Sequence, residues 1–152
     1  MERVDLNQLV SWVLEEVSGT VEKKDQKITI DFNEPIIITA DELRLGQVLV
    51  NLLDNASKYS PEGTEIDLKI EKTEETIRFT VKDNGIGIKQ EDINKLFTPF
   101  PDIERPIVSE KSVGLGLSIC RGIIELHGGN IWATSNDTNK GTTFHFTIPT
   151  KK

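Results

Sequence analysis

The sequence is short of several features that would assign it to a common class of protein. It has one cysteine, Cys120, so an internal disulfide is excluded. A single cysteine is compatible with a protein that works in a reducing compartment. No apolar run approaches the roughly 20 residues of a membrane span, and the first ten residues, MERVDLNQLV, lack the pattern of a signal peptide. We therefore expect a soluble, cytoplasmic domain without direct membrane contact, whether or not a longer parent chain is membrane-anchored.

Positive charge is also scarce, because the chain has 18 Lys and Arg against 25 Asp and Glu, which gives a net charge of −7. This balance argues against a general nucleic-acid surface, so a polyanion would need local features such as helix N-termini, a few cations and a metal. The 152 residues contain no internal repeat, and 36% of them are apolar. We expect one domain with a proper core, monomeric in isolation.

The apolar residues follow helical and strand periods in turn. A helical stripe over Asp5–Val17, capped by Asp5 and ended by Gly19, precedes strands at Lys27–Phe32 and Ile36–Thr39. A second helix opens at Asp41 and closes at SPEG, residues 60–63. The remaining pattern predicts an antiparallel hairpin over 64–83, a short helix over 89–97, a long loop over 97–113, a helix over 114–129 and a closing hairpin over 130–149.

This order of elements favours the α+β class. We predict a two-layer α/β sandwich in which a mixed, mostly antiparallel sheet packs against about three helices, and not a doubly wound parallel sheet. The loop over 97–113 holds three of the six prolines and shows no periodicity. Loops of that length in compact domains are uncommon and are often functional lids.

The polar side of the second helix carries two asparagines, Asn51 and Asn55, although Asn is a mediocre helix former. They share a polar arc of about 80° with Lys58. A solvated face is the simple interpretation. In the alternative, an amide oxygen ligates a hard cation such as Mg²⁺, Lys58 reaches a phosphate and Tyr59 lies against a base. The helix alone leaves both interpretations open.

Two glycine motifs follow. VKDNGIGI, residues 81–88, ends a strand but leads into no second strand, so a hairpin turn explains it poorly. Gly85 and Gly87 would let the backbone approach a ligand closely. Asp83 could accept a hydrogen bond from an exocyclic amine such as the adenine 6-amino group, whereas Asn84 is typical of a turn.

The second motif, GLGLS at residues 114–118, stands where the long loop becomes a helix. Small residues there expose N–H groups to an anion at the positive end of the helix dipole. Taken alone, a flexible entry turn explains the motif equally well. No Gly-Lys-Ser/Thr follows, as in a Walker A loop, and the βαβ setting of a Rossmann fingerprint is missing.

Together and in this order, the motifs resemble the catalytic, ATP-binding domain of sensor histidine kinases, within the wider group of gyrase, Hsp90 and MutL. NLLDNASKYSPEG is similar to the family's N box, DNGIGI to its first glycine box, LFTPF to its F box and GLGLS to its second glycine box. IIELHGGNIWATS and GTTFHFTIP resemble its closing segment. The resemblance covers nearly the whole chain and implies a Bergerat-type fold over 1–152, an ATP lid at about 97–114, and ATP and Mg²⁺ as cofactors.

The resemblance also implies roles for single residues. Asn55 would be the Mg²⁺ ligand, and Asn51 and Lys58 would complete the catalytic set beside the phosphates. Asp83 would bind the adenine amino group, and Tyr59 would pack against the base. The other implied nucleotide contacts are glycine-box and lid residues and one threonine: Gly85, Gly87, Ile88, Phe97, Phe100, Gly114, Leu115, Gly116, Leu117 and Thr143.

The identity of Asn51 bears on the reaction. In gyrase-like relatives a glutamate stands at this position and serves as the base for attack by water, whereas Asn51 cannot take a proton. Glu42 and Asp54, the nearest carboxylates on the helix, lie at other angles around it. The resemblance therefore implies poor ATP hydrolysis and phosphoryl transfer to a histidine on the dimerisation helices of the full-length kinase, with a response regulator downstream.

The chain has two histidines, and neither has the setting of the family's phosphoacceptor. His145 is predicted to be a solvated strand residue on the face opposite Phe144 and Phe146. His127 ends a helix, where a histidine meets the helix dipole favourably. We therefore expect the phosphoacceptor dimerisation domain to be absent from this chain.

Three other functions remain open from the sequence. A Mg-ATPase switch like gyrase or Hsp90 would turn over ATP without a partner, and Asn51 speaks against it. A nucleotide-sensing module would bind ATP or ADP without transfer; Ser112-Val113, where the family often has Gly-Thr before the second glycine box, leaves room for it. A serine kinase of the anti-sigma kind is expected to carry a carboxylate where Asn51 stands.

Overall fold

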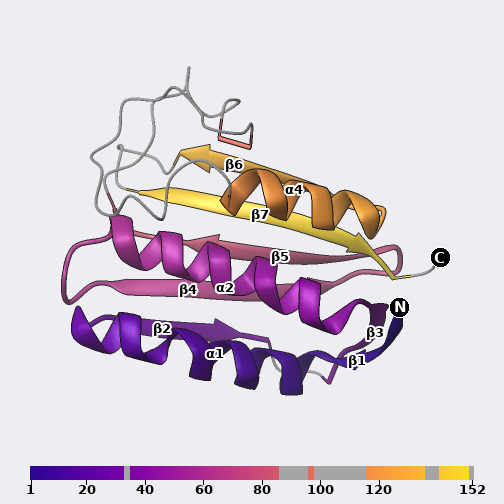
Figure 1. Ribbon diagram of the computed structural model, residues 1–152, viewed down its shortest axis with the longest axis horizontal. Helices are drawn as coiled ribbons and strands as arrows, with labels where there is room; N and C mark the ends of the chain where they lie inside the picture. The colour runs from indigo at the N-terminus through magenta and orange to yellow at the C-terminus, as the bar shows by residue number, and fades with distance from the viewer. Residues whose placement is uncertain (33–34, 86–95, 98–115, 136–140, 151–152) are drawn as a thin grey trace.

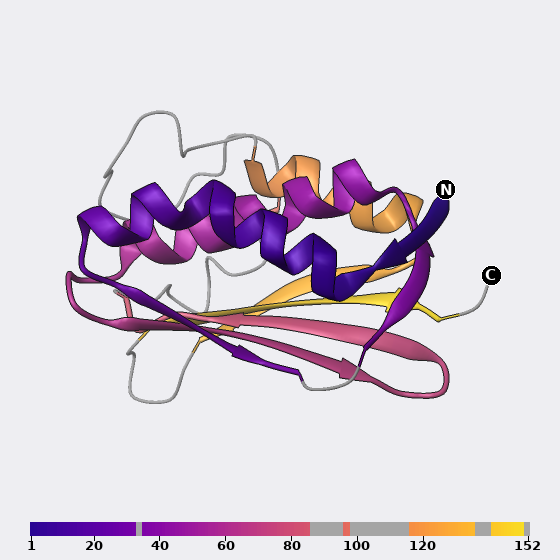
Figure 2. The same cartoon turned by 90° about the horizontal axis from the view of Figure 1, so that it is seen from below.

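The structure, a computed structural model, describes residues 1–32, 35–85, 96–97, 116–135 and 141–150. In that part of the chain all helices cover one face of a twisted sheet (Figure 2). The three helices are α1 (Leu6–Lys23), α2 (Glu42–Tyr59) and α4 (Gly116–Leu126). The predicted two-layer sandwich is confirmed. Of the short helix predicted over 89–97 and the loop over 97–113, only Leu96 and Phe97 lie among the described residues.

The main sheet has five strands in the order β2-β4-β5-β7-β6 (Figure 1). Strands β2 and β4 pair in parallel, and the other three pairs are antiparallel, so the mixed, mostly antiparallel sheet is confirmed. Both predicted hairpins form, β4 with β5 and β6 with β7. The bounds are β2 (Lys27–Asp31), β4 (Glu65–Lys72), β5 (Thr76–Lys82), β6 (Asn130–Ser135) and β7 (Thr142–Pro149).

A second, two-stranded sheet joins β1 (Glu2–Asp5) to β3 (Ile37–Ala40) in antiparallel pairing. Strand β3 was predicted one residue earlier, and β1 was not predicted. The four residues of β1 contain a single buried apolar side chain, Val4, so they carry no periodic pattern. This strand forms because β3 offers it a partner.

Helix α1 is longer than its sequence pattern indicates. Asp5 caps it as predicted, and its carboxylate accepts a hydrogen bond from Asn7 N at 2.9 Å. The prediction that Gly19 ends the helix is wrong, because Val21 adds another turn to the buried stripe and α1 continues to Lys23. The helix stops just before Asp25, whose φ of 53° leaves the right-handed region.

The core lies between the sheet and α2. Phe79 of β5 and Phe146 of β7 are directly paired across the strands and stack face to face, with ring centroids 4.3 Å apart. Helix α2 contributes Leu45, Leu49 and Leu52 to the core, and all three are fully buried. None of the helices in the described residues is long and apolar enough to cross a bilayer.

We expect Phe79→Ala to lower the free energy of unfolding by about 3–5 kcal/mol, because it removes a fully buried ring and its stacked partner contact. Urea denaturation followed by circular dichroism measures the change. Leu43→Ala is the control, since Leu43 on α2 is 72% exposed and its truncation should cost little. Equal losses in the two variants would contradict this account of the core.

Candidate nucleotide-binding site

The two asparagines occupy a face of α2 that turns inward towards its carboxyl end. Arg44 and Gln47, in the first half of the helix, are exposed, whereas Asn51, Asn55 and Lys58 are half-buried. A uniformly solvated face would not change its exposure in this way. The part of the arc that carries the asparagines is therefore less exposed than a plain solvated helix surface would be.

Asn51 connects α2 to α4. Its side-chain oxygen lies against Gly116, where an added Cβ would come within 3.5 Å of it. One turn further along α4, the thiol of Cys120 is hydrogen-bonded to the Asn51 amide. The first turn of α4, which begins in the second glycine motif, therefore lies beside Asn51. Leu117, also in that turn, is half-buried.

Asp83 follows the end of β5 and is only 1% exposed. Its Oδ1 accepts hydrogen bonds from Gly85 N and Thr142 N, each at 3.0 Å, and its own backbone N donates to Thr142 O at 3.0 Å. These bonds fix the carboxylate in one orientation. The turn role expected for Asn84 agrees with its side chain, which donates to the backbone oxygen of Glu65 at 2.9 Å.

Two glycines allow three backbone segments to meet around Asp83. A Cβ on Gly85 would lie 2.1 Å from the carbonyl oxygen of Tyr59, the last residue of α2. A Cβ on Gly141 would lie 2.1 Å from the carbonyl oxygen of Asp83, and Gly141 has a φ of +100°. No other residue fits at either position. Gly85 was predicted from the sequence, whereas Gly141 was missed.

The threonine beside Asp83 is Thr142, which the sequence reasoning also missed. Its hydroxyl is buried and has no hydrogen-bond partner among the described residues. The predicted residue, Thr143, is buried too, but the strand alternation that puts Phe144 in the core puts Thr143 on the opposite face of the sheet. The same alternation, read in the sequence, puts Thr142 on the face of Phe144, but its place beside Asp83 depends on the pairing of β7 with β5.

Two of the aromatic residues predicted for the site, Tyr59 and Phe97, are buried. Tyr59 is nearly enclosed at the end of α2. Phe97 meets Phe144 edge to face, with ring centroids 6.3 Å apart and planes at 89°, so this part of the F box is anchored in the core. Five further predicted site residues lie outside the described residues: Gly87, Ile88, Phe100, Gly114 and Leu115.

One carboxylate on α2 lies close to the asparagine face, the side of the helix that carries Asn51, Asn55 and Lys58. Asp54 is half-buried, and its burial raises the pKa of the carboxyl group above the usual value. The ammonium of Lys58, one turn further on, opposes this shift and favours the charged form. The charge of Lys58 therefore acts on Asp54 across one turn of α2.

Both histidines are engaged in structural contacts. The prediction that His145 is solvated is wrong, because the residue is only 9% exposed. Its ring stacks on Trp132 at 5.1 Å and its nitrogens contact Arg78 at 2.9 Å and Thr134 at 3.0 Å. Burial, assisted by the nearby Arg78 charge, lowers the pKa of His145. His127 directly follows the last residue of α4, close to the predicted helix end, and its Nε2 accepts a hydrogen bond from Asp41 N at 3.0 Å.

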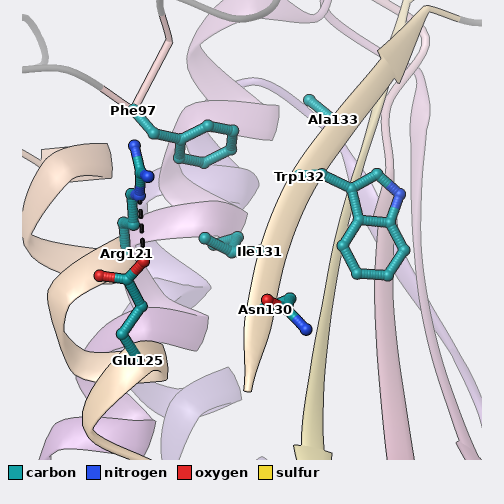
Figure 3. A pocket seen from close by; sticks show the side chains of 7 residues that line it. All are labelled: Phe97, Arg121, Glu125, Asn130, Ile131, Trp132 and Ala133. Atoms are coloured by element: carbon teal, nitrogen blue, oxygen red, sulfur yellow. Dashed lines mark hydrogen bonds and ion pairs between the residues drawn. The ribbon is translucent and has the colours of Figure 1, made fainter. Parts of the chain in front are cut away.

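A pocket of about 320 Å³ lies between α4 and the edge strand β6 (Figure 3). Phe97 and Ile131 point towards it, and an ion pair of Arg121 with Glu125, 3.3 Å long, borders it on the helix. Among the described residues that line it, Phe97 is the one predicted site residue. This pocket is therefore distinct from the asparagine face and from Asp83.

Comparison with known proteins agrees with this arrangement. The family described as "Histidine kinase-, DNA gyrase B-, and HSP90-like ATPase" matches residues 40–152. The catalytic domain of histidine kinase ThkA is similar over 99% of both chains, with a TM-score of 0.81 and 35% identity. The chain belongs to this family, among the histidine kinase catalytic domains. The mycobacterial sensor histidine kinase MprB is similar as well, with a TM-score of 0.84 and 26% identity over 97% of both chains.

Curated histidine kinases are similar in sequence to this chain over nearly its whole length. The adaptive-response sensory kinase SasA of Thermosynechococcus vestitus is 40% identical over 149 residues, which is 97% of this chain and 39% of that protein. The sensor histidine kinase WalK of Bacillus subtilis is 34% identical over 154 residues, which is 99% of this chain and 25% of that protein. The catalytic domain thus spans well under half the length of these relatives.

The Cys120 thiol of this histidine kinase domain should resist alkylation. Burial raises its pKa from 9.0 to about 12, against the opposing effect of the Asn51 hydrogen bond, so the thiol keeps its proton at pH 8. We expect iodoacetamide to leave Cys120 unmodified at pH 8 in the folded protein and to label it fully in 8 M urea, as mass spectrometry can show. Stoichiometric labelling of the folded protein would contradict the burial.

The same shift links stability to pH. The folded thiol holds its proton more tightly than the unfolded one, so the unfolded state binds fewer protons between about pH 9 and pH 12. The free energy of unfolding should therefore fall as the pH rises through that interval. Cys120→Ala should remove this part of the decline, which urea titrations at several pH values would measure.

Proposed function

We propose that this domain binds ATP with Mg²⁺ and transfers the γ-phosphoryl group to a histidine on the dimerisation helices of a full-length sensor kinase, in the cytoplasm. One observation carries the proposal: the Asp83 carboxylate is buried and held in one orientation beside the Thr142 hydroxyl, which has no hydrogen-bond partner among the described residues. Full-length ShkA, which is 29% identical to this chain, was solved in complex with AMPPNP. ThkA was solved in complex with the response regulator TrrA, and we propose a response regulator as the downstream partner here.

The base end of the proposed site lies where Gly85, Gly141 and the end of α2 meet. Asp83 would accept a hydrogen bond from the adenine 6-amino group, and Thr142 would offer its hydroxyl beside it. Tyr59 would pack against the base. A guanine carries an acceptor in place of that amine, so the Asp83 carboxylate would reject it.

The phosphate end lies along the asparagine face. Asn55 would hold Mg²⁺ through its amide oxygen, and Lys58 would contact the phosphates as a point charge. When bound, the metal neutralises negative charge on the phosphates. Asn51 and the first turn of α4 would line the other side, with Gly116 keeping that approach free of a side chain. The predicted lid and glycine-box residues outside the described part of the chain would complete the proposed site.

Asn51 is the reason why we propose phosphoryl transfer to histidine and not ATP hydrolysis. It cannot accept a proton, and its amide is hydrogen-bonded to Cys120. Asp54 is the nearest carboxylate along α2, but it lies about 60° around the helix from Asn51. The domain would therefore position the nucleotide for an incoming imidazole and activate water poorly.

We expect Asn55→Ala to abolish phosphoryl transfer, because the alanine offers no oxygen to the metal. The assay mixes the domain with the dimerisation helices of its kinase, Mg²⁺ and labelled ATP, and measures acid-labile phosphohistidine. Asn55→Asp should retain part of the activity, since its carboxylate can ligate Mg²⁺. Gln47→Ala, at an exposed position on the same helix, is the matched control and should transfer normally.

The alternatives give different results in the same assay. Appreciable ATP turnover by the domain alone would favour a conformational ATPase, and binding of ATP without any transfer would favour a nucleotide-sensing module. Failure of the wild-type domain to label the helices despite measured ATP binding would defeat the proposal.

Asp83→Asn should lower ATP affinity by about tenfold to a hundredfold and improve GTP relative to ATP. The asparagine oxygen can keep both backbone hydrogen bonds, but its amide offers a donor where the adenine amine needs an acceptor, a mismatch of about 1–3 kcal/mol. Isothermal titration with both nucleotides measures the ratio. Asp31→Asn, exposed on β2, is the control. An unchanged ATP to GTP ratio would remove Asp83 from the base contact.

A further inference from the structure

The carboxyl end of α2 receives hydrogen bonds from the turn that follows α1. Lys24 Nζ donates to the carbonyl oxygens of Ser57 at 2.6 Å, Ser60 at 2.7 Å and Lys58 at 3.3 Å. The last carbonyls of a helix have few donors of their own, and they form the negative end of its dipole. One ammonium group from a distant turn thus serves three of these oxygens.

Gln26 adds a second set of bonds to the same segment. Its Nε2 donates to the carbonyl oxygens of Ser57 and Ser60, each at 3.1 Å, and its Oε1 accepts from the Ser57 hydroxyl at 2.5 Å. Gln26 is only 7% exposed, so both ends of a buried amide are occupied by one stretch of backbone and side chain. We refer to Lys24 and Gln26 together as the latch.

The backbone on either side of the latch is joined as well. Lys24 O accepts a hydrogen bond from Gly63 N at 2.9 Å, and Lys27 N donates to Thr64 O at 3.2 Å. Figure 1 shows α1 and α2 running side by side with their carboxyl ends at the same end of the molecule. The latch is therefore a fixed connection between two turns about 35 residues apart in the chain.

The residues that the latch holds adjoin the proposed site. Lys58 lies between the latched carbonyls of Ser57 and Ser60, and so does Tyr59. The carbonyl oxygen of Tyr59 packs directly on Gly85, and Gly85 N binds the Asp83 carboxylate. A displacement of the α2 end would therefore move the proposed phosphate-binding lysine, the base-stacking tyrosine and the support of Asp83 together.

We infer that Lys24 and Gln26 are positioning residues for the nucleotide site, acting through the carboxyl end of α2 without touching the nucleotide. The inference rests on the proposed function, because it requires Lys58, Tyr59 and Asp83 to bind ATP. A latch that only stabilised the helix would change the melting temperature and leave the affinity of the folded protein unaltered. Affinity and stability are therefore measured separately.

The test compares Lys24→Met with Lys23→Met. Both remove a lysine at the end of α1, but Lys23 is exposed and makes no contact with α2 among the described hydrogen bonds. Isothermal titration with AMPPNP and Mg²⁺ is done at 15 °C, after circular dichroism has been used to check that each variant is folded. We expect Lys24→Met to weaken binding at least fivefold and Lys23→Met to leave it unchanged. Lys24→Arg, which keeps the charge and donors, should recover part of the affinity.

A second readout does not depend on the nucleotide. In the free protein, the amides of Tyr59, Ser60 and Gly85 should exchange with solvent faster in Lys24→Met than in Lys23→Met. If Lys24→Met does not fold, Ser57→Ala, which removes only the hydroxyl bonded to Gln26, is tested by the same two measurements. In transfer assays the latch variants should show a raised KM for ATP with kcat retained at saturating ATP.

The outcomes separate the two proposals. Wild-type affinity in folded Lys24→Met, with only a lowered melting temperature, would overturn the inference and leave the proposed function intact. Absence of AMPPNP binding by the wild-type domain would overturn the proposed function and the inference with it. Weakened binding in both lysine variants would point to a general charge effect and would likewise overturn the positioning role.

Discussion

The burial of one side of α2 against the sheet is the constraint on which the rest of this structure depends. Leu45, Leu49 and Leu52 are fully enclosed, so the helix cannot rotate without exposing them. Its neighbours α1 and α4 pack on either flank (Figure 1). On the remaining side Asn51 lies against the first turn of α4 at Gly116, and in the proposed site this polar arc would form one wall.

Different devices hold the two ends of this helix. At the amino end Asp41 caps Arg44 N, and its own backbone N donates to His127 of α4. At the carboxyl end the donors come from the turn after α1. In the proposed site the amino half of α2 only supports the fold, whereas the residues of its last two turns would contact the nucleotide and the metal. The carboxyl end of the helix therefore requires the more exact placement. His127, just after α4, thus serves the fold, as does His145, which is buried on the face of the sheet opposite the core.

Much of the fold could be predicted from local pattern. Both hairpins, the two helix caps and the two-layer arrangement follow from periodicity and turn chemistry, which act over a few residues. The extension of α1 past Gly19 and the strand β1 were missed, because each depends on a partner surface that no short window contains. His145 was assigned to solvent from alternation alone, yet Trp132 and Arg78 from neighbouring strands cover it.

The proposed site, like the fold, could be predicted only in part from the sequence. The sequence by itself determined which residue types are present and in what order, and these were enough to indicate the family and to single out Asn51, Asn55, Lys58 and Asp83. Only the tertiary structure decided that Thr142 lies beside Asp83, that Gly141 admits the backbone there and that Lys24 holds the end of α2. The physical reason is that hydrogen bonds and close backbone contacts between distant segments depend on their positions in three dimensions, and residue type carries that information only indirectly.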